Sequence, residues 1–447
     1  MTERLLQFIW QFQYFNKSEL VTDAGESVQI IFPGQYNTNQ GPDFSDAKIR
    51  IGKTTWAGSV ELHIKTSDWN KHNHQGDKNY TNVILHVVWE DDGGRNSVPA
   101  ISTEQSSVVP LGSRNSVPAN STERSSAVPV VEVKDRVSKI LLQRYEELMN
   151  SSAFIPCEKS IASVRDIVWK SWKDRLLAER LMRKAKTVET YLLQNNYHWE
   201  ETFWWLLARN FGMKVNADAF ETIAKSISVN ILAKHKSQIH QLEALVLGQA
   251  GLLEEKFSED YSKLLQREYK FLKEKYKLKP IHQPVHFLRM RPGNFPTIRL
   301  AQLAALITES AHLFSKIKES KTVKEISQWF DVTANDYWHY HYRFDETSAF
   351  KKKKLGATMI DNIIINTVAP VLFAYGTYHD ENKYKEKALK WLEATAAESN
   401  SITKGFQLLS IENKNAFDSQ ALIELKNEYC NKKRCLDCGV GNAILKS

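Results

Sequence analysis

Residues 41–89 read GPDFSDAKIRIGKTTWAGSVELHIKTSDWNKHNHQGDKNYTNVILHVVW, and this stretch decides how the first part of the chain folds. Apolar and polar residues alternate in AKIRI (47–51), VELHIK (60–65) and VILHVVW (83–89), which is the period of half-buried strands. The earlier stretch SVQIIF (27–32) has the same pattern. We therefore expect several short strands between residues 17 and 90, with 46–51 and 55–65 forming a hairpin.

From about Lys134 onward the apolar period becomes that of helices. The clearest stripe consists of Trp169, Trp172, Leu176, Leu181, Ala185, Val188 and Leu192. Further helical segments are expected at about 198–212, 240–278, 297–318, 356–376, 382–397 and 414–429. The predicted fold class is mixed α+β: a small N-terminal α/β module (1–150), a larger all-helical domain (151–429) and a cysteine-rich tail (430–447) that packs back near Cys157.

One segment fits neither part of this organisation. RNSVPAISTEQSSVVP (95–110) recurs as RNSVPANSTERSSAVP (114–129), a tandem duplication that is rich in Ser and Pro. Such a composition buries too little apolar surface to offset the entropy of ordering. We expect residues 95–129 to be a disordered loop insert whose deletion leaves the fold intact.

Composition sets broad limits on the class of protein. The chain has 447 residues, a net charge of +8 and an ordinary hydrophobic fraction of 42%. A basic chain of this kind permits a nucleic-acid partner without requiring one. The opening MTERLLQFIWQFQYF is typical of a helix rather than of a secretion signal. The most apolar run, 363–375, is shorter than the ~20 residues of a membrane span, so we expect a cytoplasmic protein without a membrane segment.

Acids and histidines are concentrated in the 41–89 stretch. In a strand, side chains two apart share a face, so Glu61, His63 and Lys65 project together. Asp43 follows Pro42 at the start of the preceding strand and lies near one end of that face. An acid at a strand start, followed by an acid and a base alternating on the next strand, resembles the PD-(D/E)xK nuclease superfamily.

That resemblance implies roles for these residues. Asp43 and Glu61 would hold a catalytic Mg²⁺ or Mn²⁺ ion, and His63 or Lys65 would be the basic partner. The sequence departs from the motif, because the residue two after Glu61 is histidine rather than lysine. A polar sheet face with solvated acids is the alternative interpretation.

The connection that follows, SDWNKHNHQGDKNY (67–80), adds further ligand-type residues. His72, His74 and Asp77 lie in this connection, and His86 lies on the next strand. Three imidazoles and a carboxylate could bind a second metal such as Zn²⁺ or Mn²⁺, or contact substrate phosphates.

The chain has four cysteines, three of them clustered near its C-terminus: Cys157, Cys430, Cys435 and Cys438. In a reducing compartment this pattern favours a metal over a disulfide. The predicted site is structural and holds a [4Fe-4S] cluster or Zn²⁺. The layout also resembles iron–sulfur nucleases of the AddB type, although the spacing and the place of the first cysteine differ. Three reduced cysteines near a helix end are the alternative.

Two stretches of the helical part combine aromatic and basic residues. DYWHYHYRF (336–344), followed by four lysines (351–354), is compatible with a single-strand-binding surface or with ordinary core packing. FLRMRPGNFPTIRL (287–300) places arginines around a turn that leads into a helix, where a phosphate can bind. For both stretches, core aromatics with solvated basic side chains are the favoured interpretation.

Several long motifs resemble an uncharacterised bacterial family known as domain of unknown function 2851. They are GPDF (41–44), WAGSVELHIKTSDWNKHNH (56–74), NVILHVVW (82–89), IPCE (155–158), RPGNFP (291–296), INTVAPVLFAYG (365–376) and CNKKRCLDCGVGN (430–442). This family brings no activity with it. From the residues we expect a metal-dependent phosphodiesterase, most simply a nuclease acting on DNA or RNA. The alternative is a non-catalytic nucleic-acid or protein-binding scaffold with a structural zinc or iron–sulfur site.

Overall fold

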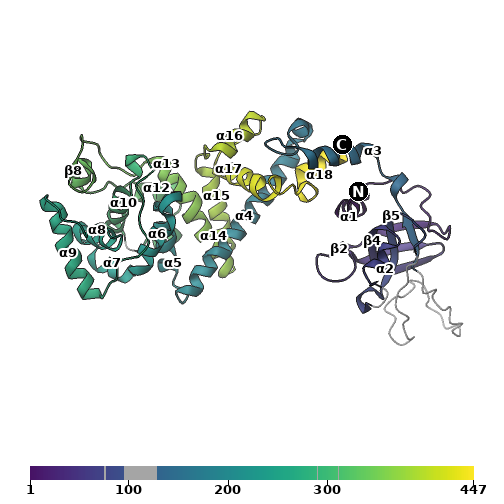
Figure 1. The fold of residues 1–447 in the computed structure, drawn as a ribbon, viewed down its shortest axis with the longest axis horizontal. Coiled ribbons are helices and arrows are strands. Elements are labelled where there is room, and N and C mark those ends of the chain that lie inside the picture. The colour runs from purple at the N-terminus through teal and green to yellow at the C-terminus, as the bar shows by residue number, and fades with distance from the viewer. Residues whose placement is uncertain (75–76, 95–127, 289, 311) are drawn as a thin grey trace. The chain divides into compact units, whose positions relative to one another are not determined.

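Figure 1 shows the computed structural model of the chain, which describes residues 1–74, 77–94, 128–288, 290–310 and 312–447. The chain divides into two compact units. Unit 1 comprises residues 1–169 and 429–447, and unit 2 comprises residues 170–428. The predicted mixed α+β class, with a small N-terminal sheet and a larger helical part, is confirmed. The predicted loop insert lies outside the described residues, apart from its last two positions.

Unit 1 is built on a mixed sheet with the strand order β1-β3-β4-β5-β6, and β2 also pairs with β3. The strands are β1 (Val28–Phe32), β2 (Gln35–Tyr36), β3 (Phe44–Ile51), β4 (Thr54–Lys65), β5 (Val83–Glu90) and β6 (Val130–Glu132). β3 is antiparallel to its neighbours, and β3–β4 is the predicted hairpin. β5 is parallel to β4, so the chain crosses over between them through α2 (Asp68–Lys71) and a short 3₁₀ helix (Lys78–Tyr80).

The central strand β4 is buried on both faces. Val60 and Leu62 point into one apolar layer, as the alternation predicts, but Glu61 and His63 on the opposite face are also buried. Helix α1 (Glu3–Phe12) packs against β4 and begins at the N-cap residue Thr2, whose side chain accepts a hydrogen bond from the Leu5 N–H group. Polar side chains on the second face of β4 are therefore shielded from much of the surrounding water.

A bulge in β3 determines how the N-terminal end of this strand pairs with β4. The pairing shifts by one residue between Phe44 and Ala47, and Asp46 has a left-handed backbone with φ of 58°. Bulges bend a strand locally and redirect the side chains beside them. Asp43, just before this bulge, thereby faces Glu61 on β4.

The C-terminal residues belong to unit 1. Unit 1 also contains α3 (Lys139–Asn150), 3₁₀ helices at Lys134–Arg136, Glu158–Ser163 and Cys435–Asp437, and α18 (Gly439–Lys446). The hydroxyl of Tyr14 donates to Asn442 Oδ1 at 2.7 Å. A Cβ atom on Gly441 would lie 2.2 Å from the carbonyl oxygen of Cys435. Glycine is therefore required for α18 to pack this closely against the cysteine turn.

Unit 2 is helical, with one two-stranded sheet of β7 (His341–Arg343) and β8 (Glu346–Thr347). The predicted stripe from Trp169 to Leu192 lies on α4 (Asp166–Gln194), which belongs to unit 2 from residue 170 onward. The remaining helices are α5 (Trp199–Phe211), α6 (Met213–Ser226), α7 (Val229–His235), α8 (Ile239–Gln249), α9 (Asp260–Tyr276), α10 (Pro296–Glu309), α11 (Leu313–Glu319), α12 (Val323–Trp329), α13 (Ala357–Ile363), α14 (Ala369–Tyr378), α15 (Asn382–Ala394), α16 (Ser401–Leu408) and α17 (Ala416–Glu424).

Two predicted helices are each split in the structure. The expected helix at 240–278 is α8 and α9, and Gly251 between them has a φ of 73°, outside the range of a right-handed helix. The expected helix at 297–318 is α10 and α11. Both predictions had the correct element type but joined two helices into one.

Helices α13 and α14 are continuous through a π-helical turn at Ile364–Val368. Pro370 has no N–H group to donate to the carbonyl of Asn366, so a regular α-helical bond is missing there. The joined helix, Ala357–Tyr378, is longer than the expected apolar run. Among the described residues it is the one helix long and apolar enough to cross a membrane, but 72% of its most apolar window is buried inside the protein, as in a core helix.

Candidate functional site

Two acids contact each other on the second face of β4. The Asp43 N–H group donates to Glu61 Oε2 at 2.9 Å, and the Leu62 N–H group donates to Asp43 Oδ2 at 3.2 Å. Burial raises the pKa of both carboxyl groups, and the charge of Glu61 raises the pKa of Asp43 further. Within the described part of the chain, no Lys or Arg side chain forms an ion pair with either acid. Among the described residues the pair therefore has no Lys or Arg cation beside it, and its raised pKa values mean that it holds a proton more tightly than a free carboxyl group does.

His63 lies at the centre of the site. Its Nε2 atom is 3.5 Å from Glu61 Oε1 and 3.1 Å from His72 Nδ1, and its Nδ1 atom is 2.9 Å from His86 Nε2. Burial lowers the pKa of His63 to about 2 and that of His86 to about 3, so both rings are neutral at neutral pH. If His63 Nδ1 carries the proton and donates to His86, the Nε2 lone pair faces Glu61 and His72.

Three imidazoles have the spacing of metal ligands. The donor atoms of His63, His72 and His74 all lie within 4.8 Å of one another. His74 Nε2 is 3.4 Å from Glu61 Oε1, is buried and forms no hydrogen bond. Ligand bonds of about 2.0–2.1 Å at a tetrahedral ion separate the donor atoms by about 3.3–3.4 Å. The His63–His72, Glu61–His63 and Glu61–His74 distances of 3.1, 3.5 and 3.4 Å are close to this separation, whereas the histidine donors as a set spread over up to 4.8 Å.

Local backbone structure positions the two histidines of the crossover. His72 ends α2, and Asn73 has a left-handed φ of 59°, a conformation that Asn tolerates well. After this turn His74 is buried, and its ring stacks on Tyr80 with 3.8 Å between ring centroids. His72 remains exposed, so solvent can reach the three histidines from the side of His72.

The other predicted site residues relate to this group in different ways: Lys65 does not reach it, the charge of Asp77 acts on His74, and His86 contacts His63. Lys65 is exposed, and its charge acts on Asp92 rather than on Glu61. Asp77 accepts a hydrogen bond from the Asn79 N–H group as a helix cap. His86 is fully buried and contacts His63 at Nδ1, whereas the other ring nitrogen of His63, Nε2, faces Glu61. Direct ligand or substrate roles for these residues stay predictions.

Residues of α1 complete the surroundings of the acids, and the sequence interpretation missed them. Gln7 Nε2 donates to Asp43 Oδ1 at 2.7 Å, and the Tyr36 hydroxyl donates to Gln7 Oε1 at 3.2 Å. The charge of Glu3 adds to the electrostatic effect that raises the pKa values of Asp43 and Glu61. Glu3 and Gln7 are four residues apart and so share one helix face, which is the signal that could have found them.

The four cysteines all belong to unit 1 and form no disulfide. Cys157, Cys435 and Cys438 are buried. Burial, with the neighbouring Cys438 and Cys435, raises the pKa of Cys157 to about 12, and burial with Cys438 raises that of Cys435 to about 12. The three thiols are therefore close enough to one another for the charge of one to affect the pKa of another. Occupation of this group by zinc or an iron–sulfur cluster stays a prediction.

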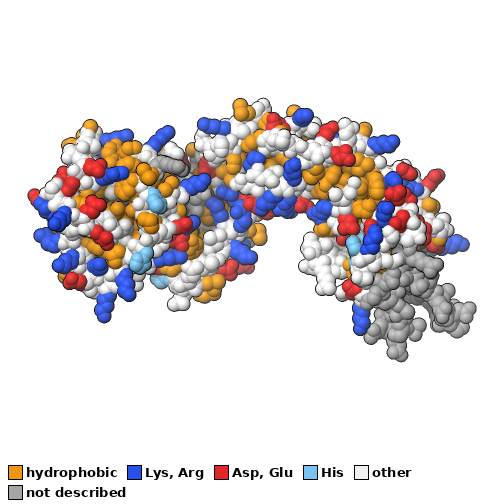
Figure 2. Space-filling view, viewed as in Figure 1, with side chains coloured by type: hydrophobic (Ala, Val, Ile, Leu, Met, Phe, Trp, Pro, Cys, Tyr) orange, Lys and Arg blue, Asp and Glu red, His pale blue; other side chains and the backbone are white. Residues whose placement is uncertain are grey.

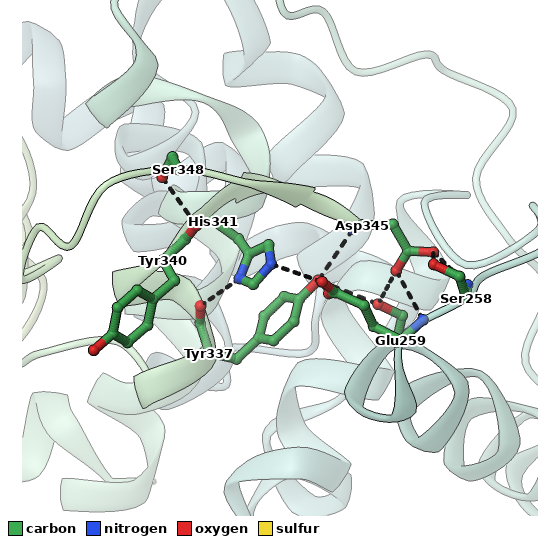
Figure 3. Close-up of polar contacts among 8 residues, drawn as sticks. Ser258, Glu259, Tyr337, Tyr340, His341, Asp345 and Ser348 are labelled. Atoms are coloured by element: carbon green, nitrogen blue, oxygen red, sulfur yellow. Dashed lines mark hydrogen bonds and ion pairs between the residues drawn. The ribbon is translucent and has the colours of Figure 1, made fainter.

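A second acid–histidine cluster occurs in unit 2 and includes the aromatic stretch 336–344 (Figure 3). His341 Nε2 is 3.1 Å from Glu259 Oε1, and the Tyr337 hydroxyl donates to Glu259 Oε2 at 2.7 Å. Asp345 accepts hydrogen bonds from the hydroxyls of Ser258 and Ser262, both at 2.9 Å. Each acid in this cluster has its own donors. The contacts tie the loop after Tyr337 to the start of α9, which is a structural role.

The lysines after this stretch do not form one uniform basic surface. Lys353 is buried beneath the ring of Tyr342, 3.8 Å from its centroid, and Lys354 pairs with Asp331. Figure 2 shows Lys and Arg side chains spread over the visible face of the chain among acidic and apolar ones. Net charge alone therefore does not mark a nucleic-acid surface here.

Fold and site together define an α+β protein with a buried carboxylate–histidine centre in its sheet unit. Residues 3–401 match the model of a family described as protein of unknown function (DUF2851), and the chain belongs to this family. No curated protein and no solved structure matches the chain.

Proposed function

We propose that the protein is a metal-dependent phosphodiesterase, most simply a nuclease, whose site is the carboxylate–histidine centre of unit 1. The observation that carries the proposal is the convergence of Asp43, Glu61, His63, His72 and His74. The acids lack a balancing cation among the described residues, and the imidazole nitrogens are spaced as metal ligands. A divalent ion would resolve both features at once.

The donor set indicates which ion would bind. Imidazole nitrogens suit Mn²⁺, Zn²⁺ and similar ions, whereas Mg²⁺ prefers oxygen ligands. His63, His72, His74 and Glu61 would hold the ion, and this set favours Mn²⁺ or Zn²⁺ over the Mg²⁺ that the superfamily resemblance suggests. Such an ion, when bound, lowers the pKa of water and neutralises charge that builds on a phosphate.

The protein's own groups have separate tasks in this proposal. Asp43 lies beside Glu61 and is half-buried, so it can accept a proton from water at the edge of the centre. Gln7 orients the Asp43 carboxylate through its amide hydrogen bond. His86 fixes the tautomer of His63 by pairing with its Nδ1 atom, a supporting role that is common for metal-binding histidines.

The test is a cleavage assay with end-labelled single- and double-stranded DNA and RNA, with Mn²⁺, Zn²⁺ or Mg²⁺ added. We expect cleavage of at least one polymer with Mn²⁺ and its loss in Asp43→Asn and Glu61→Gln. The matched control is Glu132→Gln, an exposed acid on β6 of the same sheet. Absence of cleavage of all four polymers with every ion would rule out the nuclease.

We also propose that Cys157, Cys430, Cys435 and Cys438 bind a structural Zn²⁺ ion or [4Fe-4S] cluster. The proposal is supported by the burial of three of these thiols and by their proximity. Metal analysis and the visible spectrum of protein purified without air test it. We expect Cys435→Ser to lose this metal and to keep Mn²⁺ binding at the histidine centre, and full retention of the metal would contradict the assignment. A protein with the cysteine metal but no cleavage would be the scaffold of the alternative hypothesis.

A further inference from the structure

A large cavity in unit 2 takes no part in the proposed function. Its volume is about 840 Å³, within the size range of small-molecule sites. It is lined by parts of α4, α5, α6, the start of α10 and the helix formed by α13, the π turn and α14. All of these lining residues belong to unit 2, so the cavity is complete within one unit.

The ionisable side chains that line the cavity are all basic, although burial lowers the pKa of Lys184 to about 7. They are Lys184, Arg209, Lys214, Arg291 and Arg299. No Asp or Glu is among the described lining residues. Asp218 and Glu221 balance the charge of Arg209 from outside the cavity. Lys214 and Arg291 are exposed and form no ion pair with any described residue. The cavity therefore has an excess of positive charge.

Arg299 is the most informative of these cations. Its side chain is only 8% exposed, yet its hydrogen bonds go to the neutral side chains of Gln302 (2.9 Å) and Asn294 (2.6 Å). Its Nε atom is buried and has no partner. A buried guanidinium without a carboxylate is unfavourable unless another anion meets it. An anion in the cavity would supply the missing partner.

The rest of the lining is not built for a simple inorganic anion. Leu206, Met359 and Val371 form an apolar part of the wall. The π turn brings Asn366 into the lining, where its Oδ1 atom accepts from Lys184 Nζ at 2.9 Å. π turns inside helices occur frequently at functional sites. Apolar wall, amide groups and cations together suit a ligand with a flat ring system and a phosphate.

We propose that this cavity binds a nucleoside phosphate, with the phosphate at Arg299 and Arg291 and the base against the apolar wall. The ligand is either a free nucleotide or the terminal nucleotide of a strand with a 5′-phosphate. The site is separate from the metal centre, so the proposal stands or falls without the nuclease.

Equilibrium binding to the full-length protein tests the proposal. The probes are AMP, ATP, inorganic phosphate, adenosine, and one oligonucleotide with either a 5′-phosphate or a 5′-hydroxyl end. We expect saturable binding of a nucleotide, weaker binding of both phosphate and adenosine, and competition between the nucleotide and the phosphorylated oligonucleotide if strand ends are the source. If the phosphorylated oligonucleotide does not compete, the source is the free nucleotide.

Two sets of variants locate the site. The double variant Arg291→Gln with Lys214→Gln, and the single variant Arg299→Met, are each expected to weaken nucleotide binding at least tenfold. The control Lys186→Gln with Lys236→Gln changes the net charge equally at exposed lysines outside the cavity. The proposal is wrong if no probe binds, if phosphate alone binds as tightly as the nucleotide, or if the control weakens binding as much as Arg291→Gln with Lys214→Gln does.

Discussion

The two units each contain a cluster of acids and histidines, and the clusters differ in how their charges are satisfied. In unit 2, Glu259 accepts hydrogen bonds from Tyr337 and contacts His341, and Asp345 accepts from serine hydroxyls. In unit 1, Asp43 and Glu61 lie against each other, beside histidines that burial keeps neutral. A high local density of acids and imidazoles therefore does not identify a functional site. The two clusters differ in that the unit 2 acids have tyrosine, histidine and serine partners, whereas the unit 1 acids lie against each other with no Lys or Arg among the described residues beside them.

The largest difference that we predict between the two clusters is in the rate of metal-dependent cleavage. Glu61→Gln keeps the shape of the side chain but removes a ligand and a charge, so we expect metal-dependent cleavage to fall by more than about 100-fold, the loss that supporting residues alone can cause. Glu259→Gln in unit 2 should leave cleavage within about twofold of wild type. Initial rates with a labelled oligonucleotide measure both. Equal losses in the two variants would remove the distinction between the clusters.

A second prediction concerns Glu243, next to the unit 2 cluster. This fully buried acid accepts from Trp338 Nε1 (3.0 Å) and the Tyr261 hydroxyl (2.7 Å), and burial raises its pKa from 4.5 to about 7. The folded chain thus holds this proton more tightly than the unfolded chain. Its contribution to the free energy of unfolding is full below pH 4.5 and falls by about 3 kcal/mol as pH rises through 7.

Glu243→Gln should remove this pH dependence. Urea unfolding between pH 4.5 and 8 measures the free energy of unfolding of wild type and variant. The difference between the two proteins removes the contribution of the other titrating groups, because they are the same in both. The variant should gain relative stability steadily as pH rises. A constant difference across the range would show that Glu243 titrates normally.

A third prediction uses metal binding to test the histidine centre of unit 1 against an exposed histidine of unit 2. Mn²⁺ at about 100 times its Kd should stabilise the folded protein by about 2.7 kcal/mol, which raises the Tm of a domain of this size by about 5–10 °C. His72→Ala, at an exposed ligand, should abolish the shift. His282→Asn, at an exposed histidine of unit 2, should retain it. An unchanged shift in His72→Ala would mean that Mn²⁺ binds elsewhere.

The smallest predicted effect is on the free energy of unfolding, which should change in opposite directions in a variant of each cluster. Without metal, Glu61→Gln relieves the repulsion between two buried acids and should stabilise unit 1 by about 1 kcal/mol. Tyr337→Phe removes the hydrogen bond to Glu259 and should destabilise unit 2 by about 1 kcal/mol. Chemical denaturation in the presence of a chelator compares the two. Destabilisation by Glu61→Gln would indicate that the acid pair is a structural contact like that of unit 2.

Much of unit 1 could be predicted because its strands are short and their alternation is regular. The shared face of Glu61 and His63 follows from the two-residue period of β4. The same period predicts that Lys65 joins them, but this residue is at the end of β4, where the side chain is exposed. Position along the strand, which the period does not encode, decides which residues reach the site.

The remaining parts of the site depend on contacts between distant segments. Gln7 reaches Asp43 because α1 packs against β4, and His86 reaches His63 through the parallel pairing of β5 with β4. Neither contact has a local sequence signal. In unit 2, the sequence shows the glycine at position 251 and the proline at position 370. It does not show whether a helix ends at such a residue, as near Gly251, or continues through a π turn, as before Pro370, because that depends on the packing around it.

The return of residues 429–447 to unit 1 has a consequence for synthesis on the ribosome. The first 169 residues emerge early, yet Cys430, Cys435, Cys438 and α18 follow only after all of unit 2. At 5–20 residues per second, the intervening segment takes roughly 10–50 s to translate. Unit 2 can fold during that interval, whereas unit 1 must wait until residues 439–446 have been made before α18 docks.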